Sequence, residues 1–190
     1  MTRRVRRPVL RTFFATVVVS VGVIAGTAAA WAHVTLQPPA LPKGASDVII
    51  GFAVPNESAT GTSTTKVEVL LPTDHPITGI HAETMAGWST AVETVKLAKP
   101  ITTDDGQITE VVSKVTWTTT GPGIAPNEYG EFNLLAGLLP SNVKALTFKV
   151  VQTYSDGQVV SWIESTVKGS PTPEHPAPVL KLTGKTKSSR

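Results

Sequence analysis

The sequence predicts an all-β fold, an antiparallel β-sandwich of the immunoglobulin or cupredoxin kind. The first observation is a period of two in the apolar residues: Val67, Val69 and Leu71 alternate with polar neighbours, as in a strand with one buried face. The second is the turn chemistry between such segments, for example the Ser-Asp-Gly sequence at 155–157. The third is that no stretch of the length of a helix is convincingly amphipathic. Many short strands with regular turns are typical of a sandwich.

Ten strands follow from this pattern in chain order. The first two flank a Pro-Lys-Gly turn at 42–44, and the fifth and sixth flank an Asp-Asp-Gly turn at 104–106. A Gly-Pro-Gly turn at 121–123 separates the sixth from the seventh, and Leu146 begins the alternation of the eighth. A Pro-rich stretch at 169–178 precedes the last strand. We expect the strands over 33–37, 47–54, 64–71, 77–83, 88–96, 108–118, 128–135, 144–153, 158–167 and 178–183.

The first 32 residues have the layout of a cleaved secretory signal peptide. An almost unbroken apolar run from Phe13 to Ile24 is short for a bilayer span, which takes about 20 residues, and Ala30-Trp31-Ala32 fits the A-x-A cleavage pattern. We therefore expect an exported protein, extracellular or at the outer face of the cytoplasmic membrane, with no stable membrane span after cleavage. The export route, general secretory or twin-arginine, stays open. The charged front consists of Arg3, Arg4, Arg6, Arg7 and Arg11.

Cleavage after Ala32 would change the charge of the chain. It would remove five arginines and no acidic residue, which leaves 12 Lys and Arg against 14 Asp and Glu, a net charge of −2. Nucleic-acid binding then loses its main compositional support. The chain has no Cys, so neither disulfides nor thiolate ligands are available. We expect one domain at 33–184 and a mobile basic tail at 185–190.

His33 would be the first residue of the mature chain. A free N-terminal histidine offers its α-amine and its ring Nδ1, which together close a six-membered chelate around a metal. The α-amine has an ordinary pKa of about 7.7–8.0, so a metal can displace its proton near neutral pH. Nitrogen-rich planar coordination favours Cu(II). On this reasoning alone, a second interpretation stays open, which is that a histidine follows the cleavage site by chance.

Glu57 is the candidate third ligand. If 33–37 and 47–54 pair antiparallel, His33 lies opposite roughly residue 54, and Glu57 follows just past the strand end. Its carboxylate could complete a planar site of nitrogen and oxygen ligands, although a solvated loop residue is the alternative interpretation. His75, His81 and His175 are interpreted as surface or otherwise satisfied histidines. The second Pro-Asn-Glu stretch, at 126–128, is interpreted as the start of a strand with turn capping.

Five segments in order make the chain similar to the YcnI-like copper-binding domain: Ala32-His33-Val34-Thr35, Val54-Pro55-Asn56-Glu57, Gly87-Trp88, Gly130-Glu131-Phe132, and Tyr154-Ser155-Asp156-Gly157 followed by Trp162. The resemblance covers about 33–184. It implies a β-sandwich that binds one Cu(II) through a single-histidine brace, with His33 and Glu57 as ligands and Trp162 close to the metal. By its strand pattern alone, Trp162 could equally be a core residue. The resemblance also implies a membrane partner, a copper transporter of the CopD type.

The function expected from these observations is an extracytoplasmic copper carrier (metallochaperone) or buffer, and not an enzyme. Two alternatives from other classes stay open. One is a copper-dependent enzyme like the lytic polysaccharide monooxygenases, which need a second histidine in the brace. The other is a metal-free envelope or adhesion domain, whose strands and turns would look the same. The sequence carries no G-x-S-x-G elbow, no Gly-rich phosphate loop and no H-E-x-x-H motif.

Overall fold

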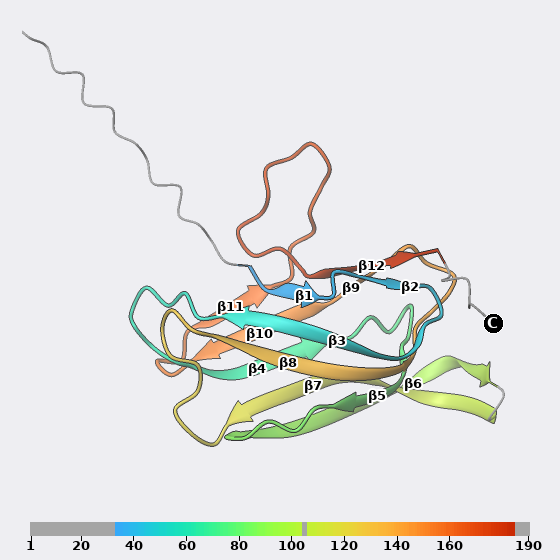
Figure 1. Ribbon diagram of the computed structural model, residues 1–190, viewed down its shortest axis with the longest axis horizontal. Coiled ribbons are helices and arrows are strands. Elements are labelled where there is room, and N and C mark those ends of the chain that lie inside the picture. Colours follow the sequence, from blue (N-terminus) through green and yellow to red (C-terminus); the bar gives the residue numbers. More distant parts are fainter. Residues whose placement is uncertain (1–32, 104–105, 185–190) are drawn as a thin grey trace, which may run out of the picture. The chain divides into compact units, whose positions relative to one another are not determined.

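The computed structural model describes residues 33–103 and 106–184. The predicted signal peptide and the predicted basic tail lie outside these residues. The described chain consists of strands, turns and loops without a helix (Figure 1), and it holds no helix that could cross a membrane. The strands are β1 Thr35–Gln37, β2 Ala40–Pro42, β3 Ser46–Pro55, β4 Thr64–Leu70, β5 Thr78–Ala82, β6 Trp88–Thr103, β7 Gly106–Thr119, β8 Tyr129–Leu138, β9 Ala145–Thr147, β10 Lys149–Tyr154, β11 Val159–Trp162 and β12 Val179–Thr183.

The strands form three sheets. A four-stranded sheet has the order β1-β3-β8-β5, a five-stranded sheet has the order β11-β10-β4-β7-β6, and a small third sheet has the order β2-β12-β9. All pairs are antiparallel except β12 with β2. Together with the all-β content, this arrangement confirms the predicted antiparallel sandwich.

The core forms where the apolar faces of the two larger sheets meet. Phe52 of β3 and Phe132 of β8 come from the four-stranded sheet, and Val67 of β4 and Trp117 of β7 come from the five-stranded sheet; all four are fully buried in one cluster. The rings of Trp117 and Phe132 lie 5.3 Å apart, so this contact joins the sheets directly. The period of two in the sequence produces these faces, because alternate residues of a strand point to opposite sides.

The strand boundaries differ from the prediction mainly in four places. The strand predicted over 88–96 continues to Thr103 as β6. Residues 144–153 form two strands, β9 and β10, which belong to different sheets, because the chain changes sheets at Phe148. Residues 40–42 form a strand, β2, that the sequence did not indicate. The predicted strand at 158–167 ends at Trp162, and the chain then leaves the sheet in a long loop before β12 (Figure 1).

Candidate metal centre

The pairing of β1 with β3 sets the position of His33. Thr35 lies opposite Ala53, and continuing this register by two residues places His33 opposite Pro55, one residue from the predicted partner. Because β3 ends at Pro55, Glu57 follows just past the strand end, as expected. His33 is partly buried and Glu57 is exposed. The N-terminal end of β1 and the loop after β3 therefore lie at the same end of the sheet.

Asn56 fixes the loop that carries Glu57. Its side chain is 2% exposed, and its Nδ2 donates to the carbonyl oxygens of Thr62, at 2.8 Å, and Ile124, at 2.7 Å. Its Oδ1 accepts a hydrogen bond from the backbone N of Ser58 at 2.9 Å. A buried amide with three such bonds is held in one orientation. The backbone on both sides of Glu57 is therefore anchored.

The second Pro-Asn-Glu stretch pairs with the first. The backbone N of Asn56 donates to the Glu128 carbonyl at 2.8 Å, and the backbone N of Asn127 donates to the Asn56 carbonyl at 3.1 Å. A carboxylate oxygen of Glu128 accepts from the backbone N of Ala125 at 3.3 Å, which agrees with the capping role predicted for this stretch. A shallow pocket of about 490 Å³ lies between the two stretches, lined by residues 55–58 and 126–129.

Trp162 forms a wall beside His33. The indole is 3% exposed, and its ring centroid lies 6.0 Å from that of His33 in a T-shaped contact with an interplanar angle of 70°. Edge-to-face geometry of this kind is favourable for aromatic rings. Trp162 also belongs to the hydrophobic core. The sequence left core packing and a site wall as two interpretations of this residue. Its place in the core cluster supports core packing, and its role beside a metal stays a prediction.

Gln152 ties this wall to the strand that precedes Glu57. The side chain is fully buried. Its Oε1 accepts from Nε1 of Trp162 at 3.2 Å, and its Nε2 donates to the Pro55 carbonyl at 2.9 Å and to Oγ1 of Thr64 at 2.7 Å. The Pro55 carbonyl, Oγ1 of Thr64 and Nε1 of Trp162 therefore each have a hydrogen-bond partner in this amide. Sequence reasoning missed Gln152, whose only signal was a polar residue on the inward face of its strand, between Val150 and Tyr154.

Tyr154 lies beneath the Glu57 loop. Its side chain is 5% exposed, and burial raises the pKa of its phenol above the ordinary value of 10.0. A backbone hydrogen bond at Glu57 opposes this rise in the pKa, and the negative charges of Glu57 and Asp156 add to it. The carboxylate of Glu57 is therefore close enough to the buried phenol of β10 to affect it electrostatically.

The structure brings a second histidine to this region. The imidazole of His175 contacts Trp162 with its ring centroid at 5.1 Å and an interplanar angle of 74°. The sequence placed His175 in a loop and predicted a surface or satisfied histidine. It is indeed a loop residue, but it is partly buried against the indole. Only the path of the loop, which the sequence does not reveal, brings it there.

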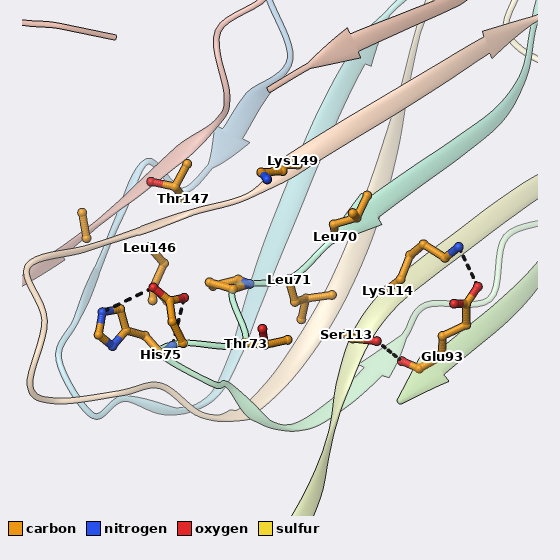
Figure 2. A pocket seen from close by; sticks show the side chains of 13 residues that line it. Leu70, Leu71, Thr73, His75, Glu93, Ser113, Lys114, Leu146, Thr147 and Lys149 are labelled. Atoms are coloured by element: carbon orange, nitrogen blue, oxygen red, sulfur yellow. Dashed lines mark hydrogen bonds and ion pairs between the residues drawn. The ribbon is translucent and has the colours of Figure 1, made fainter. Parts of the chain in front are cut away.

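The other two histidines lie apart from His33. His81 is exposed on β5. Nε2 of His75 lies 3.7 Å from a carboxylate oxygen of Asp74, at one side of a pocket of about 700 Å³ (Figure 2). On another side of this pocket Lys114 contacts Glu93 at 2.6 Å (Figure 2). None of the predicted ligands lines this pocket.

The predicted donor set at the end of β3 combines two side chains with the α-amine expected after cleavage. Among residues 33–103 and 106–184, no three or more His, Cys, Asp or Glu side chains gather in a group that could hold a metal ion. The predicted brace needs only two side chains, those of His33 and Glu57, because the α-amine released by cleavage is its third donor. The imidazole, the carboxylate and the amine are nitrogen and oxygen donors, which suit Cu(II).

The chain shares its fold with a solved structure from Nocardia farcinica, an uncharacterized protein described as having an immunoglobulin-like fold. The two are 34% identical, the match covers 79% of this chain and 97% of that one, and the TM-score is 0.62. A cohesin of Acetivibrio cellulolyticus scaffoldin B, solved with a dockerin, matches with 12% identity, coverage of 80% and 98%, and a TM-score of 0.41. A search of curated proteins gave no match.

A family model described as a domain of unknown function, DUF1775, matches residues 33–182. This match begins at the residue predicted to follow the signal peptide, and it ends inside β12. It covers nearly all of the described chain. The protein therefore belongs to the DUF1775 family, with an immunoglobulin-like β-sandwich.

Proposed function

We propose that this protein is an exported Cu(II)-binding protein that carries or buffers copper outside the cytoplasm. The α-amine and imidazole of His33 and the carboxylate of Glu57 would hold one Cu(II). The observation that carries the proposal is the place of His33: its imidazole packs on the buried indole of Trp162, at the end of the sheet where the Glu57 loop begins. The resemblance to YcnI-like copper-binding domains, which are grouped as DUF1775, supports the same ligands.

The chemistry of the chain favours the oxidised ion. Soft sulfur ligands select Cu(I), and the sequence has no Cys and, after residue 32, only Met85. His33 would contribute two nitrogens in one chelate, which binds a metal more tightly than two separate donors because less freedom is lost. Glu57 would neutralise part of the charge of the ion. Copper is cargo in this proposal, so the site must both hold it and release it.

The surrounding residues support these two functions. Asn56 holds the Glu57 loop through three hydrogen bonds, which lowers the entropy that copper binding would cost. Trp162, held by Gln152, covers one side of His33 and would limit the access of water. Because Glu57 is exposed, the opposite side is accessible to a partner. A membrane copper transporter of the CopD type is the partner that the family resemblance suggests.

Substitution of Glu57 tests the donor set. The mature chain beginning at His33 should bind one Cu(II), and Glu57→Gln should weaken binding by at least about tenfold, since it removes a charged oxygen ligand. Glu128→Gln is the matched control, because Glu128 occupies the same position in the second Pro-Asn-Glu stretch and caps Ala125. Equal loss in both variants, or in neither, would contradict the assignment of Glu57.

The same samples separate the other two classes of function. A monooxygenase-like enzyme would cleave polysaccharide chains when loaded with copper and given a reductant such as ascorbate. A metal-free adhesion or envelope domain would bind no copper, and changes at His33 would alter nothing except stability by a few tenths of a kcal/mol. The carrier proposal expects stoichiometric binding, transfer to a chelator, and no chain cleavage.

A further inference from the structure

The loop between β11 and β12 folds back onto the candidate site. It leaves the five-stranded sheet after Trp162, and the chain joins the small third sheet at Val179 (Figure 1). Near its end, the imidazole of His175 meets the indole of Trp162 edge to face at 5.1 Å. The indole therefore has two imidazole neighbours, His33 at the start of the described chain and His175 in this loop.

Glu164 holds the backbone of His175 in place. The carboxylate of Glu164 accepts from the backbone N of His175 at 2.7 Å, and the backbone N of Glu164 donates to the His175 carbonyl at 3.1 Å. The backbone N of Ala177 donates to the Glu164 carbonyl at 2.8 Å, and Glu164 forms an isolated parallel bridge with Pro176. These bonds close the base of the loop, and they fix His175 against the wall that it contacts.

The contacts of the indole limit how it can move. Its Nε1 is bound to Gln152, and its ring has His33 and His175 as edge-to-face neighbours. Rotation of the ring away from His33 would break the hydrogen bond with Gln152 and the contact with His175 together. A buried ring that is held by both a polar and an aromatic partner is well ordered.

We propose that His175 is a positioning residue of the copper site: its ring packs on Trp162, keeps the indole against His33, and thereby slows the release of bound Cu(II). His175 acts through the indole and does not ligate the ion. This inference rests on the proposed function, because it concerns the retention of copper by His33 and Glu57.

Two substitutions of His175 test the proposal. In His175→Ala, transfer of Cu(II) from the loaded protein to a chelator should be about 2- to 12-fold faster, the factor that corresponds to an aromatic pair of ordinary strength. His175→Phe keeps a packing ring and should restore slow transfer, although it cannot ligate copper. The electron paramagnetic resonance spectrum should be the same in all three proteins. His75→Ala is the matched control, because His75 pairs with Asp74 away from the site.

Three outcomes would overturn the proposal. A change in the nitrogen coupling of the paramagnetic resonance spectrum in both variants would show that His175 is a ligand. Fast copper transfer in His175→Phe would show that ring packing is not the cause. Unchanged copper transfer in His175→Ala would show that His175 does not slow release. The nuclear magnetic resonance signal of the indole N–H of Trp162 in the copper-free protein gives an independent readout. If the wild type binds no Cu(II) but this resonance shifts in His175→Ala and returns in His175→Phe, His175 does position the indole, and the failure lies in the proposed copper function. If the wild type binds Cu(II) but the resonance does not shift in His175→Ala, the positioning role fails and the proposed function stands.

Discussion

Gln152 offers the sharpest test of how the wall of the site is held. Its fully buried amide makes three side-chain hydrogen bonds, to Pro55, Thr64 and Trp162, at 2.9, 2.7 and 3.2 Å. Gln152→Leu keeps a similar volume but removes all three. Oγ1 of Thr64 and Nε1 of Trp162, both in buried hydrogen bonds, and the partly buried carbonyl of Pro55 then lose a partner.

The expected cost follows from these contacts. Each broken bond that leaves a buried group unsatisfied costs about 1–3 kcal/mol, and burying the apolar leucine returns about 1.5–3 kcal/mol. Two unsatisfied buried groups at the middle of the first range, less the leucine gain at the middle of the second, lower the free energy of unfolding by about 2 kcal/mol. In a domain of this size that corresponds to a melting temperature about 4–8 °C lower. The indole of Trp162, without its polar anchor, should also hold His33 less firmly.

Urea unfolding of the mature chain, followed by circular dichroism, measures this loss. Gln158→Leu is the control, because Gln158 is exposed in the turn between β10 and β11 and its substitution should change stability by less than about 0.5 kcal/mol. If Gln152→Leu is at least as stable as the wild type, the lost hydrogen bonds cost no more than the burial of leucine returns, and the reasoning is refuted.

Three further predictions concern the loops and strands around the same site. Asn56→Ala should lower the free energy of unfolding by about 2–4 kcal/mol and weaken copper binding, since three hydrogen bonds of a buried amide are lost. An unaltered copper affinity would show that the order of the Glu57 loop does not contribute to binding. Because burial raises the pKa of Tyr154 above 10.0, the folded state holds that proton more tightly, so the stabilisation is complete below about pH 10 and is lost as the pH rises toward the higher folded value. Unfolding measured from pH 9 upward should show a smaller alkaline loss in Tyr154→Phe and no such difference in Tyr129→Phe, the control at an exposed tyrosine. Gly123→Ala should lower the free energy of unfolding by more than about 3 kcal/mol, because the added Cβ would lie 2.1 Å from a backbone oxygen. The control is Gly61→Ala, which also has a positive φ but meets nothing within 4 Å and should cost about 1 kcal/mol. Similar losses for the two variants in thermal melts would show that the structure relieves the close approach at Gly123.

The fold class could be predicted because it depends on local patterns. The period of two in the segment 64–71 directly encodes one buried face, and β4 occupies nearly the same residues. The third sheet could not be predicted in this way. Its strands β2, β9 and β12 have only three to five residues each, and β2 pairs in parallel with a strand from the other end of the chain. Short segments carry too little alternation to reveal such a distant partner.

The candidate site could be predicted only in part, for a similar reason. The register of β1 with β3 follows from sequence proximity, so the relative place of His33 and Glu57 was expected to within one residue. Gln152 bonds to residues 88 and 97 positions away, and no local pattern indicates those partners. His175 depends on the hydrogen bonds of Glu164 that turn its loop back, and a Pro-rich loop has no periodicity from which its path can be read.

The most direct test of the central claim is electron paramagnetic resonance of the mature chain titrated with Cu(II), compared with a twin that carries one additional Gly before His33. The extension leaves every side chain in place and moves only the free α-amine. The account predicts one tightly bound Cu(II) with nitrogen coupling in the authentic chain and the loss of that signal in the twin. Identical spectra from the two chains, or no tight binding by either, would contradict the N-terminal copper site.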